Sequence, residues 1–565
     1  MSPSQPLPVI LLWHMHQPQY KDALTGQYAL PWTYLHAIKD YTDMAAHLEA
    51  NREARAVVNF TPLLIEQVEE LARRIAGHFD SGSPLPDPVL GLLGPGPVPT
   101  EPAARLELLR ACLKAQRKQM IERFGPYLEL ATIAETLGTP ERVAYASDQF
   151  IHDLAVWYHL AWLGETVRRA DPLVARLTER GRDFSAPQRR ELLRLIAELI
   201  AQVIPRYRQL AERGQIELSV TPYGHPIIPL LLDFQCARDA VPAMTLPHHA
   251  RYPGGAARAT WHIEEALRVF TRAFGIRPAG CWPAEGAISA GTLELLASVG
   301  GFRWAASSAG VLRLSLAQTD AEAATDPLAY NRSYRLGGTG MSCFFRDDGL
   351  SDLIGFTYAT WHGDDAAANL VSQLNQLARE YHDGNHAVLI ALDGENAWEH
   401  YPFNGYYFLR ALYSQLAKHP HLRLTTLSEC LERGIQPAPL PRLCAGSWVH
   451  GTLATWIGEP AKNRAWDLLC DAKEAYDRMT REMDPAQRAA AMRQLALCES
   501  SDWFWWFGDY NPADAVSQFD RLYRRQLVTL YRRLNLAPPG DLALPIAAGS
   551  GAPEHGGVMR RAHAS

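Results

Sequence analysis

Two acidic segments of the chain carry residues that could cleave a sugar bond. CWPAEGAIS places Glu285 directly after an apolar run, and ALDGENAW places Asp393 and Glu395 after another. Burying a carboxylate is costly unless it is paired or used. Two opposed carboxylates suit glycosidic-bond cleavage, because one can attack the anomeric carbon while the other protonates the leaving oxygen. The alternative is that each acid is an ion-pair partner or a helix N-cap.

The segment WHMHQP places His14 and His16 on one face of a strand, and Gln17 directly follows His16. This i, i+2 spacing can chelate zinc, but a zinc site needs a third ligand. His225 and the pair at 248–249 are only candidates for it, and no H-E-x-x-H motif is present. The pattern favours hydrogen bonding to a polyhydroxylated ligand over a metal site, with a structural role as the remaining alternative.

A further acid lies inside a strand-like run, GQIELSVTPYGHP. Glu217 alternates there with Ile216 and Leu218, so its side chain points to the opposite face of the strand. In a barrel that face is the lumen. Because an interior Glu is more often functional than a surface one, we predict a role at the site for Glu217.

An aromatic-rich stretch, ESSDWFWWFGDYN (499–511), lies in the last third of the chain and includes Trp505. Clustered aromatic rings can form a wedge that fixes one domain against another. Flat amphipathic rings can also form the wall of a sugar-binding groove. Both interpretations stay open for this segment.

Composition excludes several classes of protein. With 61 acidic against 55 basic residues, the net charge is −6, so neither nucleic acid nor a membrane surface is an expected partner. The N-terminal apolar run lacks a basic region and a cleavage site, and no apolar span is long enough for a membrane. The eight cysteines are scattered singly, as is typical of free thiols in a reducing compartment. We therefore expect a cytoplasmic protein.

Short apolar runs that end in polar or aromatic residues alternate with amphipathic helical patterns along the chain. This alternation predicts an α/β fold in which helices cover a parallel sheet, and the number of units favours a barrel. Polar residues at the carboxyl ends of the strands are where barrel active sites are assembled. The predicted strands are 8–18, 54–62, 215–226, 279–289, 302–308, 351–361 and 386–396, with a last strand and helix within 422–435.

The segments between these runs predict the domain organisation. Residues 1–437 are expected to form the catalytic barrel, with a helical insertion at about 78–213. A Pro-rich joint leads to a C-terminal helical domain, 438–537, which is expected to complete the substrate groove. The tail at 538–565 contains AAGSGAPEHGG, a composition typical of disorder.

Taken in order, several segments resemble the conserved regions of glycoside hydrolase family 57. They are HMHQP, GQIELSVTPYGHPIIPLL, GCWPAEGAIS, ALDGENAW and SSDWFWWFGD, with FRDDGLSDLIGF and WIGEPAKNRAWDLL similar to its amylase and amylopullulanase branch. The resemblance implies an incomplete (β/α)7 barrel with a C-terminal helical domain. It also implies retaining cleavage of α-1,4-glucosidic bonds in an α-glucan or maltooligosaccharide, without a metal or other cofactor. By position, Glu285 matches the nucleophile and Asp393 the general acid/base.

The resemblance also implies a substrate-binding set around these two acids. His16, Glu217 and Glu395 match positions that line the family's active site, and Trp282 and Trp398 are expected to shape the donor-sugar subsite. The full expected set is His14, His16, Gln17, Glu217, His225, Trp282, Glu395, Trp398 and Trp505.

One departure from the family bears on the reaction. Many relatives carry an acidic pair after the FRW strand, where this chain reads Ala-Ala-Ser-Ser at 305–308. The alternatives therefore include a 4-α-glucanotransferase or branching enzyme, which would pass the sugar to another sugar instead of water. A metal-dependent carbohydrate-active enzyme on a related barrel and a catalytically silent glucan-binding module are the others. The sequence leaves the oligomeric state open.

Overall fold

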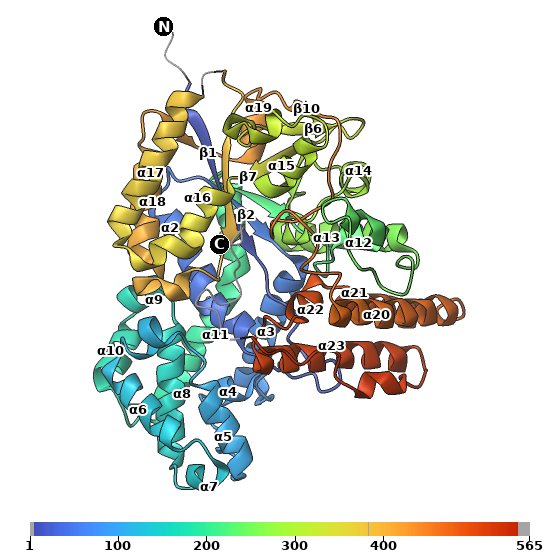
Figure 1. Ribbon diagram of the computed structural model, residues 1–565. Helices are drawn as coiled ribbons and strands as arrows, with labels where there is room; N and C mark the ends of the chain where they lie inside the picture. The colour runs from blue at the N-terminus through green and yellow to red at the C-terminus, as the bar shows by residue number, and fades with distance from the viewer. Residues whose placement is uncertain (1–4, 382, 552–565) are drawn as a thin grey trace.

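The computed structural model describes residues 5–381 and 383–551. Among them, seven parallel strands close into a barrel in the order β1-β2-β3-β4-β5-β7-β8 (Figure 1). The ring closes because β1 pairs with β2 and β8, and Arg346 of β7 pairs with Leu389 of β8. The predicted seven-stranded (β/α) barrel is confirmed. The strands are β1 (Leu7–Met15), β2 (Ala56–Phe60), β3 (Ile216–Val220), β4 (Gly280–Cys281), β5 (Trp304–Ser308), β7 (Ser342–Arg346) and β8 (Val388–Asp393).

The alternation of side chains along each strand divides the core in two. In β1, Ile10 and Leu12 join a cluster with Val57, Trp304 and other residues that fill the barrel lumen. The residues between them, such as Leu11, pack outward against the helices. Because both faces of these strands are buried, they appear in the sequence as nearly continuous apolar runs.

Helices follow most strands and cover the outside of the barrel (Figure 1). They are α1 (Trp32–His36), η1 (Ala37–Tyr41), α2 (Thr42–Ala50), α3 (Pro62–Ser81), α13 (Gly255–Phe274), α14 (Ala290–Ser298), α15 (Ala309–Ala317), α17 (Gly363–Glu380), α18 (Tyr406–Ala417) and α19 (Leu427–Glu432). The predicted last strand and helix are present, since β9 (Leu422–Leu424) pairs with β1 and α19 follows it.

Two helical bodies extend from the barrel. Between α3 and β3, the segment expected to be an insertion forms the helices at the lower left of Figure 1. These include α5 (Pro102–Ala111), α6 (Gly125–Thr136), α8 (Asp148–Trp162), α9 (Glu165–Ala170), α10 (Pro172–Arg180) and α11 (Ala186–Glu212). The C-terminal helices, drawn in red, are α20 (Pro460–Met479), α21 (Pro485–Cys498), α22 (Ser501–Trp506) and α23 (Ala513–Arg533).

The barrel sheet extends slightly beyond the predicted domain boundary. Strand β10 (Ala438–Leu440) pairs with β6 (Tyr334–Leu336), which is antiparallel to β7 at the edge of the same sheet. The residues just after 437 therefore belong to the barrel and not to the helical domain.

One predicted strand is wrong. Residues 351–361 are helical, as α16 (Asp348–Asp352) continues into η7 (Leu353–Thr357) and η8 (Tyr358–Thr360). Asp347 caps this helix by accepting a hydrogen bond from the backbone N–H of Leu350 at 2.9 Å. The strand of this unit is β7, directly before the Asp pair. A short apolar run cannot be assigned to strand or helix by periodicity alone, and the cap decides it here.

The tail is ordered in the part that the structure describes. Gly540–Ala543 forms η11, and the Leu542 side chain is buried while its carbonyl accepts a hydrogen bond from Arg524. The prediction of disorder is therefore wrong for residues 538–551, because the buried Leu542 side chain packs on the helical domain. The rest of that predicted stretch, 552–565, lies outside the described residues.

The structure also bears on the predictions about membrane spans and cysteine residues. In the described part of the chain, no helix combines the length and the apolarity needed to cross a bilayer. None of the eight cysteines, all of which are described, takes part in a disulfide, and seven are buried.

Candidate active site

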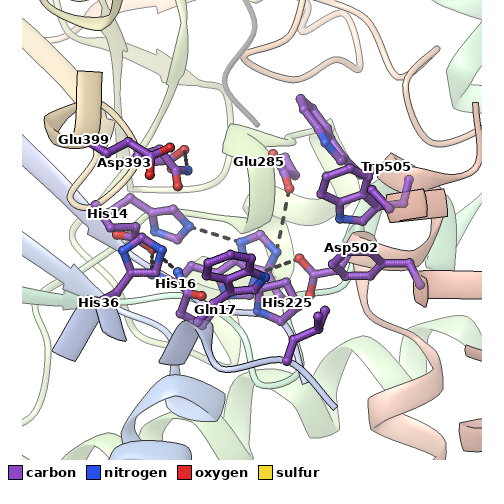
Figure 2. A pocket seen from close by; sticks show the side chains of 18 of the residues that line it. His14, His16, Gln17, His36, His225, Glu285, Asp393, Glu399, Asp502 and Trp505 are labelled. Atoms are coloured by element: carbon purple, nitrogen blue, oxygen red, sulfur yellow. Dashed lines mark hydrogen bonds and ion pairs between the residues drawn. The ribbon is translucent and has the colours of Figure 1, made fainter. Parts of the chain in front are cut away.

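A pocket of about 550 Å³ opens at the carboxyl ends of the barrel strands, between the barrel, the insertion and the C-terminal helices (Figure 2). It is lined by residues that are far apart in the sequence. Those used below are His14, His16, Gln17, His225, Glu285, Arg346, Asp393, Glu395, Asn396, Trp448, Asp502 and Trp505. Glu285 and Asp393 thus reach one cavity from two different strands.

Glu285 is held by a strained turn just after β4. Gly280 in β4 packs on the Trp304 ring so closely that an added Cβ would lie 1.8 Å from it. Glu285 itself adopts φ 57°, a left-handed conformation that costs a non-glycine residue about 1–2 kcal/mol. Strain of this kind persists only where the surroundings enforce it, and it is concentrated at functional sites.

A second loop fixes the Glu285 carboxylate. Ile288 and Gly446 exchange backbone hydrogen bonds of 2.9 and 3.1 Å, and the backbone N–H of Trp448 donates to the carbonyl of Glu285. This pairing brings the Trp448 indole N–H to 2.9 Å from Glu285 Oε2. The Ser501 hydroxyl lies 3.3 Å from the other oxygen, Oε1. Both carboxylate oxygens therefore face a hydrogen-bond donor.

Asp393 is the last residue of β8 and lies in register with His14 of β1. The next residue, Gly394, packs closely against β1, since a Cβ there would lie 2.2 Å from the Met15 sulfur. Asn396 donates to Asp393 Oδ2 at 2.8 Å. Among the described residues no hydrogen bond to Oδ1 is found, and the side chain lines the cavity (Figure 2). One oxygen is thus open to a ligand.

Glu395 is buried behind Asp393. Its Oε1 accepts hydrogen bonds of 3.1 Å from the backbone N–H of His16, from the Gln17 amide and from the Tyr41 hydroxyl. Burial and the negative charge of Asp393 raise the pKa of Glu395 well above its ordinary value, so the neutral acid is favoured at pH 7. These hydrogen bonds link the loop after β8 to the residues after β1, beneath the pocket.

The three histidines form a stack on the pocket floor. The rings of His16 and His225 lie 3.7 Å apart at 14°, and His14 lies 5.3 Å from His225. Burial disfavours the charged form of all three. It lowers the pKa of His14 to about 3 and that of His225 well below its usual value. For His16 the negative charges of Asp502, Glu285 and Asp393 outweigh burial and raise the pKa. Only His16 is therefore favoured as a cation.

The stacking of the histidines also bears on whether they could bind a metal ion. His16, His225 and Asp502 bring ligand atoms within 4.8 Å of one another. Ring nitrogens bind metals through lone pairs in the ring plane, and in stacked rings these lone pairs run side by side instead of converging. His16 Nε2 is paired with Asp502 at 2.8 Å, and His225 uses its nitrogens for His14 and Ser501. The other suggested ligand, His249, pairs with Asp471 outside the pocket.

The two candidate catalytic acids share a strongly unfavourable environment for charge. Burial, together with the charges of Asp393 and Asp502, raises the pKa of Glu285 to about 8, although the Trp448 hydrogen bond and His16 oppose this. Burial also raises the pKa of Asp393, against the effects of Asn396, His16 and Arg346. Both carboxyls therefore favour the protonated form more strongly than a carboxyl in water does.

The family model described as glycosyl hydrolase family 57 matches residues 10–439. The chain belongs to this family.

Three solved structures are similar to this family 57 chain. The first, a branching enzyme from Thermococcus kodakaraensis, has a TM-score of 0.59 and 14% identity over 93% of this chain and 90% of that one. A branching enzyme from Pyrococcus horikoshii has a TM-score of 0.56 and 15% identity over 99% and 100%. An α-amylase from Thermotoga maritima has a TM-score of 0.55 and 13% identity over 94% of each chain. At such identities these likenesses show the fold alone. No curated protein sequence matches the chain.

In this family 57 chain, one expected site residue lies at the wrong end of the barrel. Glu217 points into the lumen, as its alternation predicted, but it is the second residue of β3 and lies near the amino end. It accepts hydrogen bonds from the Trp304 indole at 2.7 Å and from Ser428 at the start of α19. Glu217 is therefore not part of the pocket lining, and it anchors the helix that closes the barrel bottom.

Two predicted donor-site tryptophans are core residues. Trp282 is completely buried in the lumen cluster, because the residue after β4 points inward. Trp398 is buried against Trp13, with ring centroids 5.8 Å apart, and its indole N–H donates to the carbonyl of Gly394. Neither is among the residues that line the pocket, and both lie in the core behind it. His14, His16, Gln17, His225, Glu395 and Trp505 do line it.

The Ala-Ala-Ser-Ser segment has a structural role that the sequence did not reveal. Ser307 donates to the carbonyl of Gly286 at 2.6 Å, and Ser308 donates to the carbonyl of Ser447 at 3.1 Å. Both hydroxyls are buried at the end of β5. They fix the Glu285 turn and the Trp448 loop.

Five of the residues that surround the two acids were not predicted from the sequence: Arg346, Asn396, Trp448, Ser501 and Asp502. Trp448 lies in a loop without a motif, and only its backbone pairing brings it to Glu285. Ser501 and Asp502 lie in the aromatic segment 499–511, from which only Trp505 was predicted to belong to the site. The sequence signal for them was present, since Ser and Asp at the first turn of a helix present polar side chains at its N-terminus.

Proposed function

We propose that this chain is a retaining enzyme acting on α-1,4-glucosidic bonds of α-glucans, with Glu285 as nucleophile and Asp393 as general acid/base. The observation that carries the proposal is the shared pocket. Two carboxylates from separate strands line one cavity. One has donors facing both oxygens, and the other has one oxygen without a hydrogen bond from the described residues. Family 57 membership supports the same reading.

In the first step, a Glu285 oxygen forms a bond to the anomeric carbon while the bond to the glycosidic oxygen breaks. The proton of Asp393 passes to that oxygen, so the leaving sugar departs neutral. In the second step, Asp393 takes a proton from water or from a sugar hydroxyl. The resulting oxygen attacks the anomeric carbon and Glu285 is released as a carboxylate.

Asp393 must be protonated and Glu285 ionised when the first step begins. Burial, together with the charges of Asp393 and Asp502, favours protonated Glu285, so the active arrangement needs other groups that favour its charged form. The Trp448 and Ser501 donors and the nearby His16 cation all favour a charged Glu285. These groups are the means by which the chain can ionise its nucleophile in a buried site.

Sugar transfer is the second candidate. The solved relatives include two branching enzymes as well as an α-amylase, and the same carboxylates serve both reactions. The pocket is continuous from the acids to Trp505 on one side and to Trp32 and Trp162 on the other, so a second sugar chain has surfaces to occupy.

Incubation with maltoheptaose separates these possibilities. Products are followed by chromatography for size and by NMR for anomeric configuration. Initial release of α-configured shorter sugars supports retaining hydrolysis, and longer or branched products support transfer. Initial release of β-configured sugars would contradict the retaining mechanism, and unchanged maltoheptaose would contradict the substrate assignment.

A further inference from the structure

His36 and Glu399 line the pocket, but neither takes part in the two steps at the anomeric carbon. His36 is the last residue of α1 and Glu399 lies in η9 (Trp398–His400), so they reach the cavity from separate parts of the chain. Figure 2 shows both side chains on the side of Asp393, whereas Trp505 lies beyond Glu285 on the other side. They therefore face the part of a ligand that lies next to the proposed acid.

The His36 ring is held in place by a buried ion pair. Its Nδ1 lies 2.6 Å from Oδ2 of Asp40, and the Lys39 ammonium donates to the other oxygen of Asp40 at 2.6 Å. Lys39 and Asp40 are both buried. Because a carboxylate only accepts hydrogen bonds, Nδ1 of His36 is the donor in this contact. The contact fixes the orientation of the ring and occupies one of its two nitrogens.

The second ring nitrogen of His36, Nε2, is left for a ligand. The residue is 8% exposed and lines the cavity, yet among the described residues no hydrogen bond to Nε2 is found. Trp162, at the end of α8 in the insertion, packs at 89° to the imidazole with ring centroids 5.6 Å apart. A sugar hydroxyl both donates and accepts, so it can bond to Nε2 in either protonation state of the ring.

Glu399 adds a carboxylate to the same side of the pocket. Its side chain is 25% exposed and its Oε1 lies 3.5 Å from His400 Nε2, but among the described residues neither oxygen receives a hydrogen bond. Burial opposes its charge, but the neighbouring His400, Lys39 and His36 outweigh burial and lower the pKa of this carboxyl. Glu399 is therefore a charged acceptor that can bind sugar hydroxyls.

A double displacement fixes which sugar occupies that side. The nucleophile attacks the anomeric carbon from the face opposite the leaving oxygen, and the acid protonates that oxygen. The leaving sugar therefore lies on the side of Asp393, and the acceptor of the second step takes the same place. We propose that His36 and Glu399 bind the hydroxyls of this sugar and so form the acceptor subsite of the pocket. Both are binding residues for the acceptor, and the inference rests on the proposed function.

The test follows how the glycosyl-enzyme is released. A nitrophenyl α-maltoside forms it, and added maltose then competes with water, so the ratio of transfer to hydrolysis at a fixed maltose concentration reports the acceptor alone. His36→Asn keeps an amide near Nδ1 for Asp40 but removes Nε2, and Glu399→Leu removes the carboxylate. We expect each change to lower the ratio by about 10-fold, because hydrogen bonds to the acceptor are lost.

A residue that acts only through Asp393 would not move this ratio, because the same base serves water and sugar. An unchanged ratio in both His36→Asn and Glu399→Leu would overturn the acceptor subsite.

Two further variants separate binding from a general effect on the fold. His47→Asn changes a buried histidine of α2 that does not line the pocket, and its ratio should match that of the wild type. Glu399→Gln keeps an oxygen that accepts hydrogen bonds and should retain more transfer than Glu399→Leu. A loss in His47→Asn equal to that in His36→Asn would overturn the role of His36, and equal losses in the two Glu399 variants would overturn hydrogen bonding by Glu399.

A second measurement does not require the wild type to transfer sugars. In His36→Asn and Glu399→Leu, kcat/KM for maltoheptaose should fall about 10-fold more than kcat/KM for the nitrophenyl α-maltoside, whose leaving group has no sugar hydroxyls. Equal falls on the two substrates would contradict the subsite. Thermal unfolding shows which variants fold, and if His36→Asn does not, the two Glu399 variants give the comparison.

Turnover by Glu285→Gln shows which proposal has failed. If that variant keeps its activity, the proposed function fails and the acceptor subsite fails with it. If it is inactive, while the His36 and Glu399 variants behave like the wild type on both substrates, only the acceptor subsite fails.

Discussion

The indole N–H of Trp448 lies 2.9 Å from Oε2 of Glu285, although 163 positions separate the two residues. The contact exists because the loop after β10 pairs with the turn that follows β4 through Ile288 and Gly446. A charge-assisted hydrogen bond in a buried site is stronger than one between neutral groups in water. Trp448 therefore both locates the Glu285 carboxylate and favours its charged form.

Replacing Trp448 tests this contact. Trp448→Phe keeps an aromatic ring but removes the donor, so we expect kcat/KM to fall by about 10- to 100-fold, the usual effect of losing a hydrogen bond to a charged group. Trp456→Phe is the matched control, because that indole nitrogen is buried without a hydrogen-bond partner among the described residues. Equal losses in both variants would remove the Trp448 hydrogen bond from the mechanism.

Glu285→Gln tests the nucleophile directly. The amide has the shape of the carboxylate but cannot form the glycosyl-enzyme, so turnover of maltooligosaccharides should fall by about 10⁴-fold or more. Binding of the oligosaccharide, measured by calorimetry, should persist. A variant that still turns over substrate would show that another group attacks the anomeric carbon.

Asp393→Asn tests the acid. Loss of a general acid typically costs about 10²- to 10⁴-fold when the leaving group is poor. We expect a loss in this range for maltoheptaose and a much smaller one for a nitrophenyl glycoside, whose phenolate leaves without a proton. Similar losses on both substrates would argue that Asp393 orients the sugar and does not protonate it.

The raised pKa of Glu285 predicts the pH dependence of the wild-type enzyme. Since burial and neighbouring charge raise this pKa to about 8, the carboxyl is protonated and inactive below that pH and ionised above it. With the nitrophenyl glycoside, kcat/KM should rise as the pH passes through about 8. A flat profile from pH 5 to pH 9 would show that Glu285 is already ionised in the acidic range.

The sequence predicted some parts of the fold and site for clear physical reasons. Strand β8 could be predicted from the sequence because both of its faces are buried and its apolar run ends at Asp393. β7 was not, since the short run at 342–346 lies just before the Asp347 cap and the apolar stretch 353–356 resembles a strand equally well. Local pattern cannot separate these cases without the packing around them.

Periodicity along a strand predicts which face a side chain points to, but it does not predict how far along the barrel axis the side chain lies. The alternation around Glu217 correctly pointed it into the lumen, yet its place near the start of β3 puts it at the end of the barrel opposite the pocket. Trp282 adjoins Glu285 only in sequence, and its own alternation buries it. The Trp448 contact depends on a backbone pairing between distant loops, which no local pattern encodes.

Glu217→Leu tests that correction. The change removes the acceptor for the backbone N–H and the hydroxyl of Ser428 and for the Trp304 indole, so the protein should unfold at a lower temperature. The value of KM for maltoheptaose should stay close to that of the wild type, because Glu217 does not line the pocket. A large rise in KM at unchanged stability would return Glu217 to the substrate site.

The last prediction concerns the buried ion pair that holds the C-terminal helices on the barrel. Glu499, directly before Ser500 and Ser501, accepts hydrogen bonds of 2.6 to 3.1 Å from Arg258 of α13 and one of 2.7 Å from His262. Burial opposes its charge, but Arg258 and His262 outweigh it and hold the pKa of Glu499 far below its ordinary value. A lowered pKa contributes stability above the ordinary value, and this contribution is lost as the pH falls below it.

Arg258→Ala should therefore lower the free energy of unfolding by about 3–5 kcal/mol, because it leaves a charge buried without its partner. Its thermal midpoint should also change less than that of the wild type when the pH is lowered from about 5 to about 3, where the contribution of Glu499 is lost. Arg272→Ala on the same helix is the control, since Arg272 and its partner Glu69 of α3 are 46% and 36% exposed. Thermal unfolding followed by tryptophan fluorescence checks both, and equal midpoints for the two variants would show that the Glu499 pair does not hold the helices in place.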